Sequence, residues 1–130
     1  GLAGVSGVSS DMREITAAAK QGNEKAILSL EMYEQRITKY VGAFAAEMGG
    51  VDIIVFTGGV GEHQSSTRAN VCNPLRFMGV EIDDAANDAN NGDEGIISTP
   101  NSAVKVVVIP TDEEYMIAKD TEAIIEGREP

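Results

Sequence analysis

The longest regular pattern in the sequence is a spacing of three or four residues between large apolar side chains across residues 23–48. The apolar positions are Ile27, Leu30, Tyr33, Ile37, Tyr40, Phe44 and Met48. This spacing places them on one face of an α-helix and predicts a helix with a buried apolar stripe. Gly49 and Gly50 end that helix, and the short apolar run at residues 51–56 predicts a buried strand before a glycine-rich segment.

Two shorter helices are expected on either side of this helix–strand unit. Residues 1–10 are rich in Gly and Ser and predict a loop, after which Ser10 caps a helix over residues 12–20. A further helix is expected over residues 65–78, and Pro74 must kink or divide it because proline lacks a backbone donor.

The last part of the chain predicts strands at residues 96–97 and 104–109, preceded by an exposed acidic loop over residues 83–94. Thr111 is expected to cap a final helix that ends at Gly127. Its apolar contacts would come from Met116, Ile117, Ala118, Ile124 and Ile125. Because helices or long loops separate the strands, the chain predicts one folded unit of the layered α/β class.

Charge and cysteine content narrow the function. The formal net charge of −11 argues against nucleic-acid binding, which relies on Lys and Arg to neutralise phosphates. We expect no membrane span and no export signal, because no apolar run approaches bilayer length. The single cysteine, Cys72, has no partner for a disulfide or a zinc site, which favours the cytoplasm. An anionic ligand would need backbone N–H groups or a metal ion to offset the acidity.

The glycine-rich segment is the first candidate site. It follows the strand as Thr57, Gly58, Gly59, Val60 and Gly61, and glycines allow a ligand to approach the backbone closely. The alternative is a plain strand-to-helix turn. A Rossmann fingerprint would need a third glycine, and a Walker A loop would need a lysine that is absent from this part of the chain.

Two polar clusters could complete a nucleotide site. Asp11, Met12 and Arg13 offer a carboxylate for ribose hydroxyls, an apolar contact for adenine and a planar cation for stacking or phosphate. The alternative is a capped helix with a solvated arginine. Glu113 and Glu114 are candidate Mg²⁺ residues, since this cation prefers carboxylate oxygen. Alternatively, they only complement the helix dipole.

Three segments together resemble the acetate kinase family: GVSSDMR at residues 7–13, FTGGVGE at 56–62, and ISTP at 97–100 followed by VIPTDEE at 108–114. The likeness covers essentially the whole chain and corresponds to the last third of such a kinase. It implies an α/β fold, the C-terminal part of an actin-like, RNase H-like ATPase domain shared with sugar kinases, Hsp70 and actin. It also implies reversible transfer of the γ-phosphoryl group of ATP to acetate, giving acetyl phosphate and ADP.

The resemblance implies that residues 1–130 are a single-domain fragment, the nucleotide-binding part. The N-terminal domain is expected to be absent, and the catalytic Asp and Arg segments are expected upstream, so that the fragment alone should be inactive. The implied nucleotide-binding residues are Asp11, Met12, Arg13, Gly59, Val60, Gly61, Glu62 and His63. His63 stands where the family usually has Asn. The implied metal residue is Glu113, with Glu114 as its competitor, for Mg²⁺ or Mn²⁺.

The resemblance further implies a homodimer that binds ATP or ADP, and acetate or acetyl phosphate in the full enzyme. Two other functions remain open. A propionate kinase or another short-chain carboxylate kinase is similar in these segments. A non-catalytic interaction domain would use the apolar surface that separation from a partner domain exposes.

Overall fold

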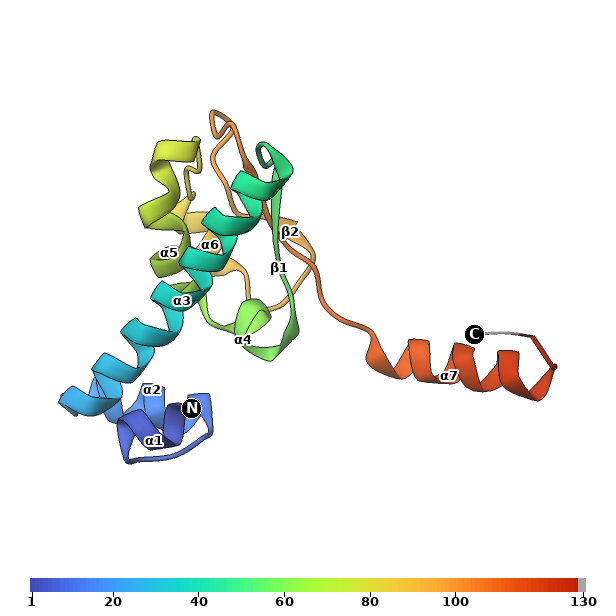
Figure 1. The fold of residues 1–130 in the computed structure, drawn as a ribbon, viewed down its shortest axis with the longest axis horizontal. Coiled ribbons are helices and arrows are strands. Elements are labelled where there is room, and N and C mark those ends of the chain that lie inside the picture. The colour runs from blue at the N-terminus through green and yellow to red at the C-terminus, as the bar shows by residue number, and fades with distance from the viewer. Residues whose placement is uncertain (129–130) are drawn as a thin grey trace.

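The computed structural model describes residues 1–128, in which seven α-helices, one 3₁₀ helix and three strands are assigned. In chain order these are α1 (Leu2–Ser6), α2 (Met12–Lys20), α3 (Glu24–Met48), β1 (Ile53–Phe56), α4 (Gly58–His63), α5 (Ser65–Cys72), η1 (Asn73–Met78), α6 (Asp84–Ala89), β2 (Gly95–Ile96), β3 (Lys105–Val108) and α7 (Glu113–Ile125). In Figure 1, α1 and α2 lie beside one end of the long helix α3, the sheet lies near its other end, and α7 stands away from the rest.

The three strands form one mixed sheet in the order β1-β3-β2. Strand β1 pairs with β3 in parallel and β2 pairs with β3 antiparallel, which leaves β1 and β2 at the two edges. The crossover between the parallel strands contains α4, α5, η1 and α6. This arrangement matches the α/β class expected from the sequence.

One face of the sheet forms the core. Its buried side chains are Ile54, Phe56, Val106 and Val108, which cluster with Val71, Cys72 and Leu75 from α5 and η1. Burial raises the pKa of the Cys72 thiol to about 12, so the thiol stays protonated and unreactive. On the opposite face Ile53, Val55 and Ile96 are about half exposed, so the described chain covers only one side of its sheet.

Helix α3 has the predicted extent, but its apolar stripe is only partly buried. Leu30, Tyr33 and Ile37 are half-buried, and Ile37 packs against the core. Ile27, Tyr40, Phe44 and Met48 are exposed. The buried positions are instead Ala26, Ser29, Glu34 and Ala45. Three of these four residues are small and allow close packing, whereas Glu34 is held by hydrogen bonds from Thr67 and Asn70. Few neighbouring elements are available to cover the rest of a helix of 25 residues.

Both predicted caps are off by one residue. Asp11 rather than Ser10 is the N-cap of α2, and its carboxylate accepts a hydrogen bond from the Arg13 amide. Likewise Asp112 rather than Thr111 is the N-cap of α7. In both cases a serine or threonine stands directly before an aspartate, and the aspartate supplies the capping oxygen.

Three segments predicted as loops or turns contain short helices. Residues 1–10 include α1, the glycine segment itself forms α4, and the acidic stretch 83–94 includes α6 with Asp83 as its N-cap. The predicted division at Pro74 is confirmed, since α5 gives way there to the 3₁₀ helix η1. The strand predicted over residues 51–56 begins only at Ile53.

Helix α7 does not make the apolar contacts expected of it. Met116, Ile117, Ile124 and Ile125 are all exposed. The helix stands clear of the layered body in Figure 1, so no element covers these side chains. Among residues 1–128 no helix is both long and apolar enough to cross a membrane.

Candidate functional site

The three glycines of α4 meet different local demands. Gly58 has φ +71°, a left-handed conformation that side chains other than glycine rarely adopt. At Gly61 a Cβ would lie 3.3 Å from the carbonyl carbon of Phe56, so close packing explains this glycine. At Gly59 a Cβ would meet nothing within 4 Å. The fold therefore does not require glycine at position 59.

A cavity of about 410 Å³ lies beside this segment, between α3 and the junction of β1 with α4. Its walls are formed by Tyr33, Ile37 and Val41 of α3, by residues 54–61, and by Thr67 and Val71. Gly59, Val60 and Gly61, predicted to bind nucleotide, are among the lining residues. Apolar walls combined with bare backbone suit a flat, largely apolar group that carries a few polar atoms.

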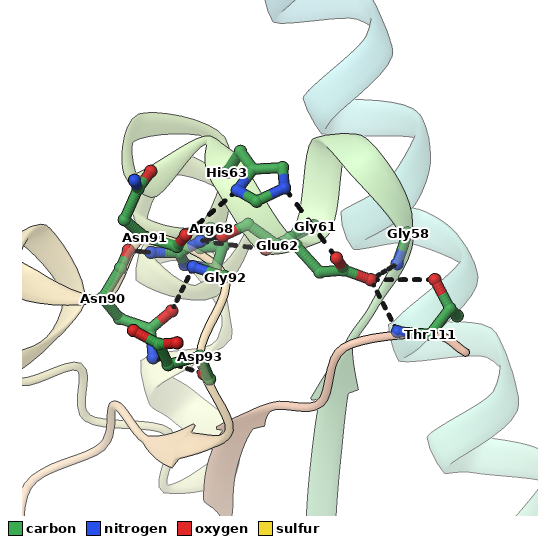
Figure 2. A network of polar contacts seen from close by, with 10 residues as sticks. All are labelled: Gly58, Gly61, Glu62, His63, Arg68, Asn90, Asn91, Gly92, Asp93 and Thr111. Carbon is green, nitrogen blue, oxygen red and sulfur yellow. Dashed lines mark hydrogen bonds and ion pairs between the residues drawn. The ribbon is translucent and has the colours of Figure 1, made fainter.

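The Glu62 carboxylate connects α4 to the segment that precedes α7 (Figure 2). Its Oε1 atom accepts hydrogen bonds from the Gly58 amide at 2.7 Å, the Thr111 amide at 2.9 Å and the Thr111 hydroxyl at 3.0 Å. The hydrogen bond from the Thr111 amide is the main cause that lowers the pKa of Glu62 below its usual value. Glu62 is thus an ionised, buried acceptor, 8% exposed.

Arg68 holds the other end of α4 and was not anticipated from the sequence. It is 0% exposed, and its guanidinium donates to the carbonyl oxygens of Gly61 and Glu62 at 2.9 and 2.7 Å. It also donates to the Asn87 side chain and to the carbonyls of Asn87 and Asn90 at 2.7 to 2.9 Å. All five bonds reach neutral oxygens. The cation therefore sits at the negative, C-terminal ends of α4 and α6.

A signal for Arg68 was present in the predicted helix over residues 65–78. Arg68 precedes Cys72 by four residues, which places it on the same face as the buried cysteine. A charged residue on an apolar face needs internal partners. Two of those partners are carbonyls of α4, and the other three lie in residues 87–90, in a stretch that the sequence predicted as exposed loop.

His63 is held against the segment after α6. Its Nδ1 atom lies 3.1 Å from the carbonyl oxygen of Asn91, and its Nε2 atom lies 3.9 Å from a Glu62 carboxylate oxygen. The imidazole covers Gly92, where a Cβ would collide with the ring. Figure 2 shows His63, Arg68 and residues 90–93 in one polar network. The His63 ring is therefore engaged by the protein, although its side chain is 55% exposed.

Asp11 and Arg13 form an exposed ion pair at the start of α2. The Asp11 carboxylate accepts from the Arg13 amide at 2.8 Å and from its guanidinium at 2.6 and 3.1 Å. Hydrogen bonding from the Arg13 side chain, the largest cause, lowers the pKa of Asp11 to about 2. Met12 between them is 9% exposed and packs inward. Within residues 1–128 no hydrogen bond joins this cluster to α4.

Glu113 and Glu114 are exposed in the first turn of α7. The structure shows no hydrogen bond or ion pair to either carboxylate within the described chain. No group of three or more His, Cys, Asp or Glu residues there is arranged to hold a metal ion. The described residues thus form no all-protein cage for a metal ion, and a metal role for Glu113 or Glu114 stays a prediction.

Comparison with known proteins identifies relatives of this chain. The family model described as "Acetokinase family" matches residues 1–119. The acetate kinase of Porphyromonas gingivalis is 60% identical over 125 residues, which cover 96% of this chain and 31% of that protein. The acetate kinase of Phocaeicola vulgatus is 62% identical over 125 residues, with the same coverage. The chain thus spans about a third of the length of these curated relatives.

Solved structures agree with the sequence matches. The crystal structure of P. gingivalis acetate kinase superposes with a TM-score of 0.88 at 59% identity, covering 96% of this chain and 31% of that one. A propionate kinase from Francisella tularensis superposes with a TM-score of 0.81 at 36% identity, covering 92% of this chain and 30% of that one. The actin-like ATPase fold expected from the sequence is confirmed by these neighbours. The chain belongs to the acetokinase family.

Proposed function

We propose that this chain is the nucleotide-binding part of an acetate kinase, which transfers the γ-phosphoryl group of ATP to acetate reversibly. The observation that carries the proposal is the bare backbone at Gly59 beside an apolar cavity. The fold does not explain this glycine, and a ligand that approaches the backbone does. Relatives at about 60% identity are named acetate kinases, which supplies the substrate class.

In this proposal α4 borders the adenosine and α-phosphate. Gly59, Val60 and Gly61 present their backbone to the nucleotide from the cavity wall. Glu62 and His63 border the same region, and the engagement of His63 by Asn91 limits how far its ring can turn toward a ligand.

Asp11, Met12 and Arg13 supply the second wall of the nucleotide site. Because Arg13 already occupies both oxygens of Asp11, the pair acts as a preformed unit. The guanidinium plane is exposed and available for stacking or phosphate contact. Met12 packs inward, so it supports these neighbours and reaches a base only at the edge of the site.

Glu113 is the residue proposed to hold Mg²⁺ or Mn²⁺, with Glu114 as the competitor. Bound between the nucleotide phosphates, such a cation neutralises charge that the acidic chain would otherwise repel. Residues that act on acetate are proposed to lie in the two-thirds of the relatives that this chain does not match. The homodimer and the cytoplasmic location stay predictions.

A second candidate is a propionate kinase, favoured by the structural match to the Francisella protein.

A chimeric enzyme tests the proposed function directly. In this chimera, the present chain replaces the matching 125 residues of P. gingivalis acetate kinase. We expect turnover of Mg-ATP with acetate, and loss of turnover on Glu113→Ala but not on Lys119→Ala, further along α7. If turnover survived Glu113→Ala but was lost on Glu114→Ala, the metal residue would be Glu114 and not Glu113. A folded but inactive chimera would contradict the proposed function.

A further inference from the structure

Glu62 and Thr111 form a hydrogen-bonded pair 49 residues apart in sequence. We infer that Glu62 is a positioning residue that holds α4 and the first turn of α7 in a fixed relative position through Thr111. The nucleotide segment and the metal residue Glu113 would then act as one unit. The inference rests on the proposed function, because it assigns a role between two parts of the same site.

The geometry of Glu62 favours this role over direct nucleotide contact. Three donors converge on Oε1, one from Gly58 and two from Thr111 (Figure 2). The other oxygen faces His63 at 3.9 Å. Oε1, with three protein donors, has no remaining capacity for a ribose hydroxyl. The Glu62 side chain as a whole is only 11% exposed, which leaves little room for a ligand at Oε2. Glu62 therefore acts on a ligand through the segments it joins.

Thr111 is the last residue that ties the C-terminal segment to the body. From residue 112 to residue 128, every hydrogen bond and ion pair that the structure shows joins two residues of that same stretch. Apart from Ala123 and Asp120, the side chains of α7 are exposed, and the helix stands apart in Figure 1. The position of Glu113 relative to α4 is therefore set at Thr111, two residues earlier in the chain.

The chain offers a matched control for this pair. The Thr99 hydroxyl donates to the Glu81 carboxylate at 3.1 Å, nearly the same distance as from Thr111 to Glu62. Within the described residues, the hydrogen bonds of Glu81 and Thr99 reach only each other and Ser102, and none reaches α4 or α7. Removing the Thr99 hydroxyl thus deletes the same kind of hydrogen bond without affecting the link between α4 and α7.

The test uses the kinase chimera, with Thr111→Val, Thr111→Ser and Thr99→Val. Losing the hydroxyl bond should raise KM for Mg-ATP about three- to tenfold in Thr111→Val, while kcat and KM for acetate stay within about twofold. Thr111→Ser keeps the donor and should restore KM. Thr99→Val should leave KM unchanged. The double variant with Glu62→Gln should show no greater loss than the larger single variant.

Other outcomes overturn the inference. A lower melting temperature with unchanged KM for Mg-ATP in Thr111→Val would show that the pair stabilises the fold but does not position the nucleotide site. Additive losses in the double variant would show that the two residues act separately. An equal loss of affinity for ADP with and without Mg²⁺ would show an effect on the nucleotide segment alone. If the unmodified chimera lacked turnover, the proposed function would fail first and the inference with it.

Discussion

Three glycines occupy four consecutive positions of α4, and each is present for a different reason. Gly58 adopts a left-handed backbone conformation and Gly61 packs against Phe56. Only Gly59 has open space where a side chain would begin. From the sequence all three suggested close approach of a ligand. The structure limits that explanation to one residue, which makes a clean substitution possible.

We expect Gly59→Ala to lower affinity for Mg-ADP without loss of stability. An added methyl group meets no protein atom, and alanine favours a helix over glycine by about 1 kcal/mol. The methyl would instead meet a ligand that approaches the backbone. Gly42→Ala is the control, since a Cβ there also meets nothing within 4 Å and α3 is helical. Calorimetric titration of both chimera variants checks this, and equal affinities would remove Gly59 from the site.

Glu34 is a second residue that the fold places unusually. Glu34 is 7% exposed, and its carboxylate accepts hydrogen bonds from Thr67 at 3.1 Å and Asn70 at 2.9 Å, with no ion pair to it within residues 1–128. Burial is the main cause that raises its pKa above the ordinary 4.5. Because this pKa is raised, the contribution of Glu34 to stability is greatest below pH 4.5 and falls as the pH rises through the folded-state pKa.

Glu34→Gln should therefore raise the melting temperature of the chain at pH 7, because a neutral amide avoids burying a charge. The gain should shrink as the pH falls through the folded-state pKa toward 4.5, and the carboxyl is protonated in both states only below that pH. Melting curves from pH 4 to pH 8 measure this, with Glu31→Gln on the exposed side of α3 as the control. A gain that is independent of pH would contradict the assigned cause.

At the scale of elements, Arg68 makes α4 and α6 one structural unit. Neither helix exceeds six residues, too short for stability in isolation. The Arg68 guanidinium donates hydrogen bonds to carbonyl oxygens near the C-terminal end of each helix. The side-chain amide of Asn87 in α6 also donates to the Ser65 carbonyl at the start of α5. The stability of the glycine segment thus depends on an arginine outside it.

Arg68→Met should destabilise the chain by about 3 kcal/mol, since it leaves several buried carbonyls without donors. Arg68→Lys should recover only part of this, because an ammonium cannot reproduce the planar fork. Arg76→Met is the control, as Arg76 is exposed on η1 with one weak contact at 3.4 Å. Urea unfolding followed by circular dichroism compares the three. Matching midpoints for Arg68→Met and Arg76→Met would show that the network contributes little.

Periodicity predicted α3, α2 and the parallel strands, because long amphipathic and apolar runs carry a strong local signal. It missed α1, α4 and α6, which hold six residues or fewer and depend on tertiary contacts such as Arg68. The glycine segment was found from its composition. The pairing of Glu62 with Thr111 could not be predicted from the sequence, because contacts between residues 49 positions apart leave no local pattern.

At the scale of the whole molecule, a large share of the apolar side chains is uncovered. The uncovered surface includes one face of the sheet, part of the apolar stripe of α3 and most of α7, where Ile125 is 80% exposed. Large exposed apolar surfaces indicate regions that another part of a protein covers. The match to about a third of each relative agrees with this view.

The chain of 130 residues should therefore self-associate at micromolar concentrations when it is prepared alone. Replacing Ile117 and Ile124, seven residues apart on one face of α7, by Gln should reduce the association. The control replaces Lys119 and Glu122 by Gln, which alters α7 without changing its apolar surface or the net charge. Sedimentation velocity at several concentrations measures this, and a monomer throughout would show that the patches do not attract one another.

The order β1-β3-β2 has a consequence for how a larger protein could be assembled around this piece. Strand β1 is paired only on the side of β3, so its outer edge keeps a row of backbone donors and acceptors free within the described chain. Such an edge is a template on which a further strand can be laid down. A further strand could therefore extend the small sheet by forming backbone hydrogen bonds along the free edge of β1.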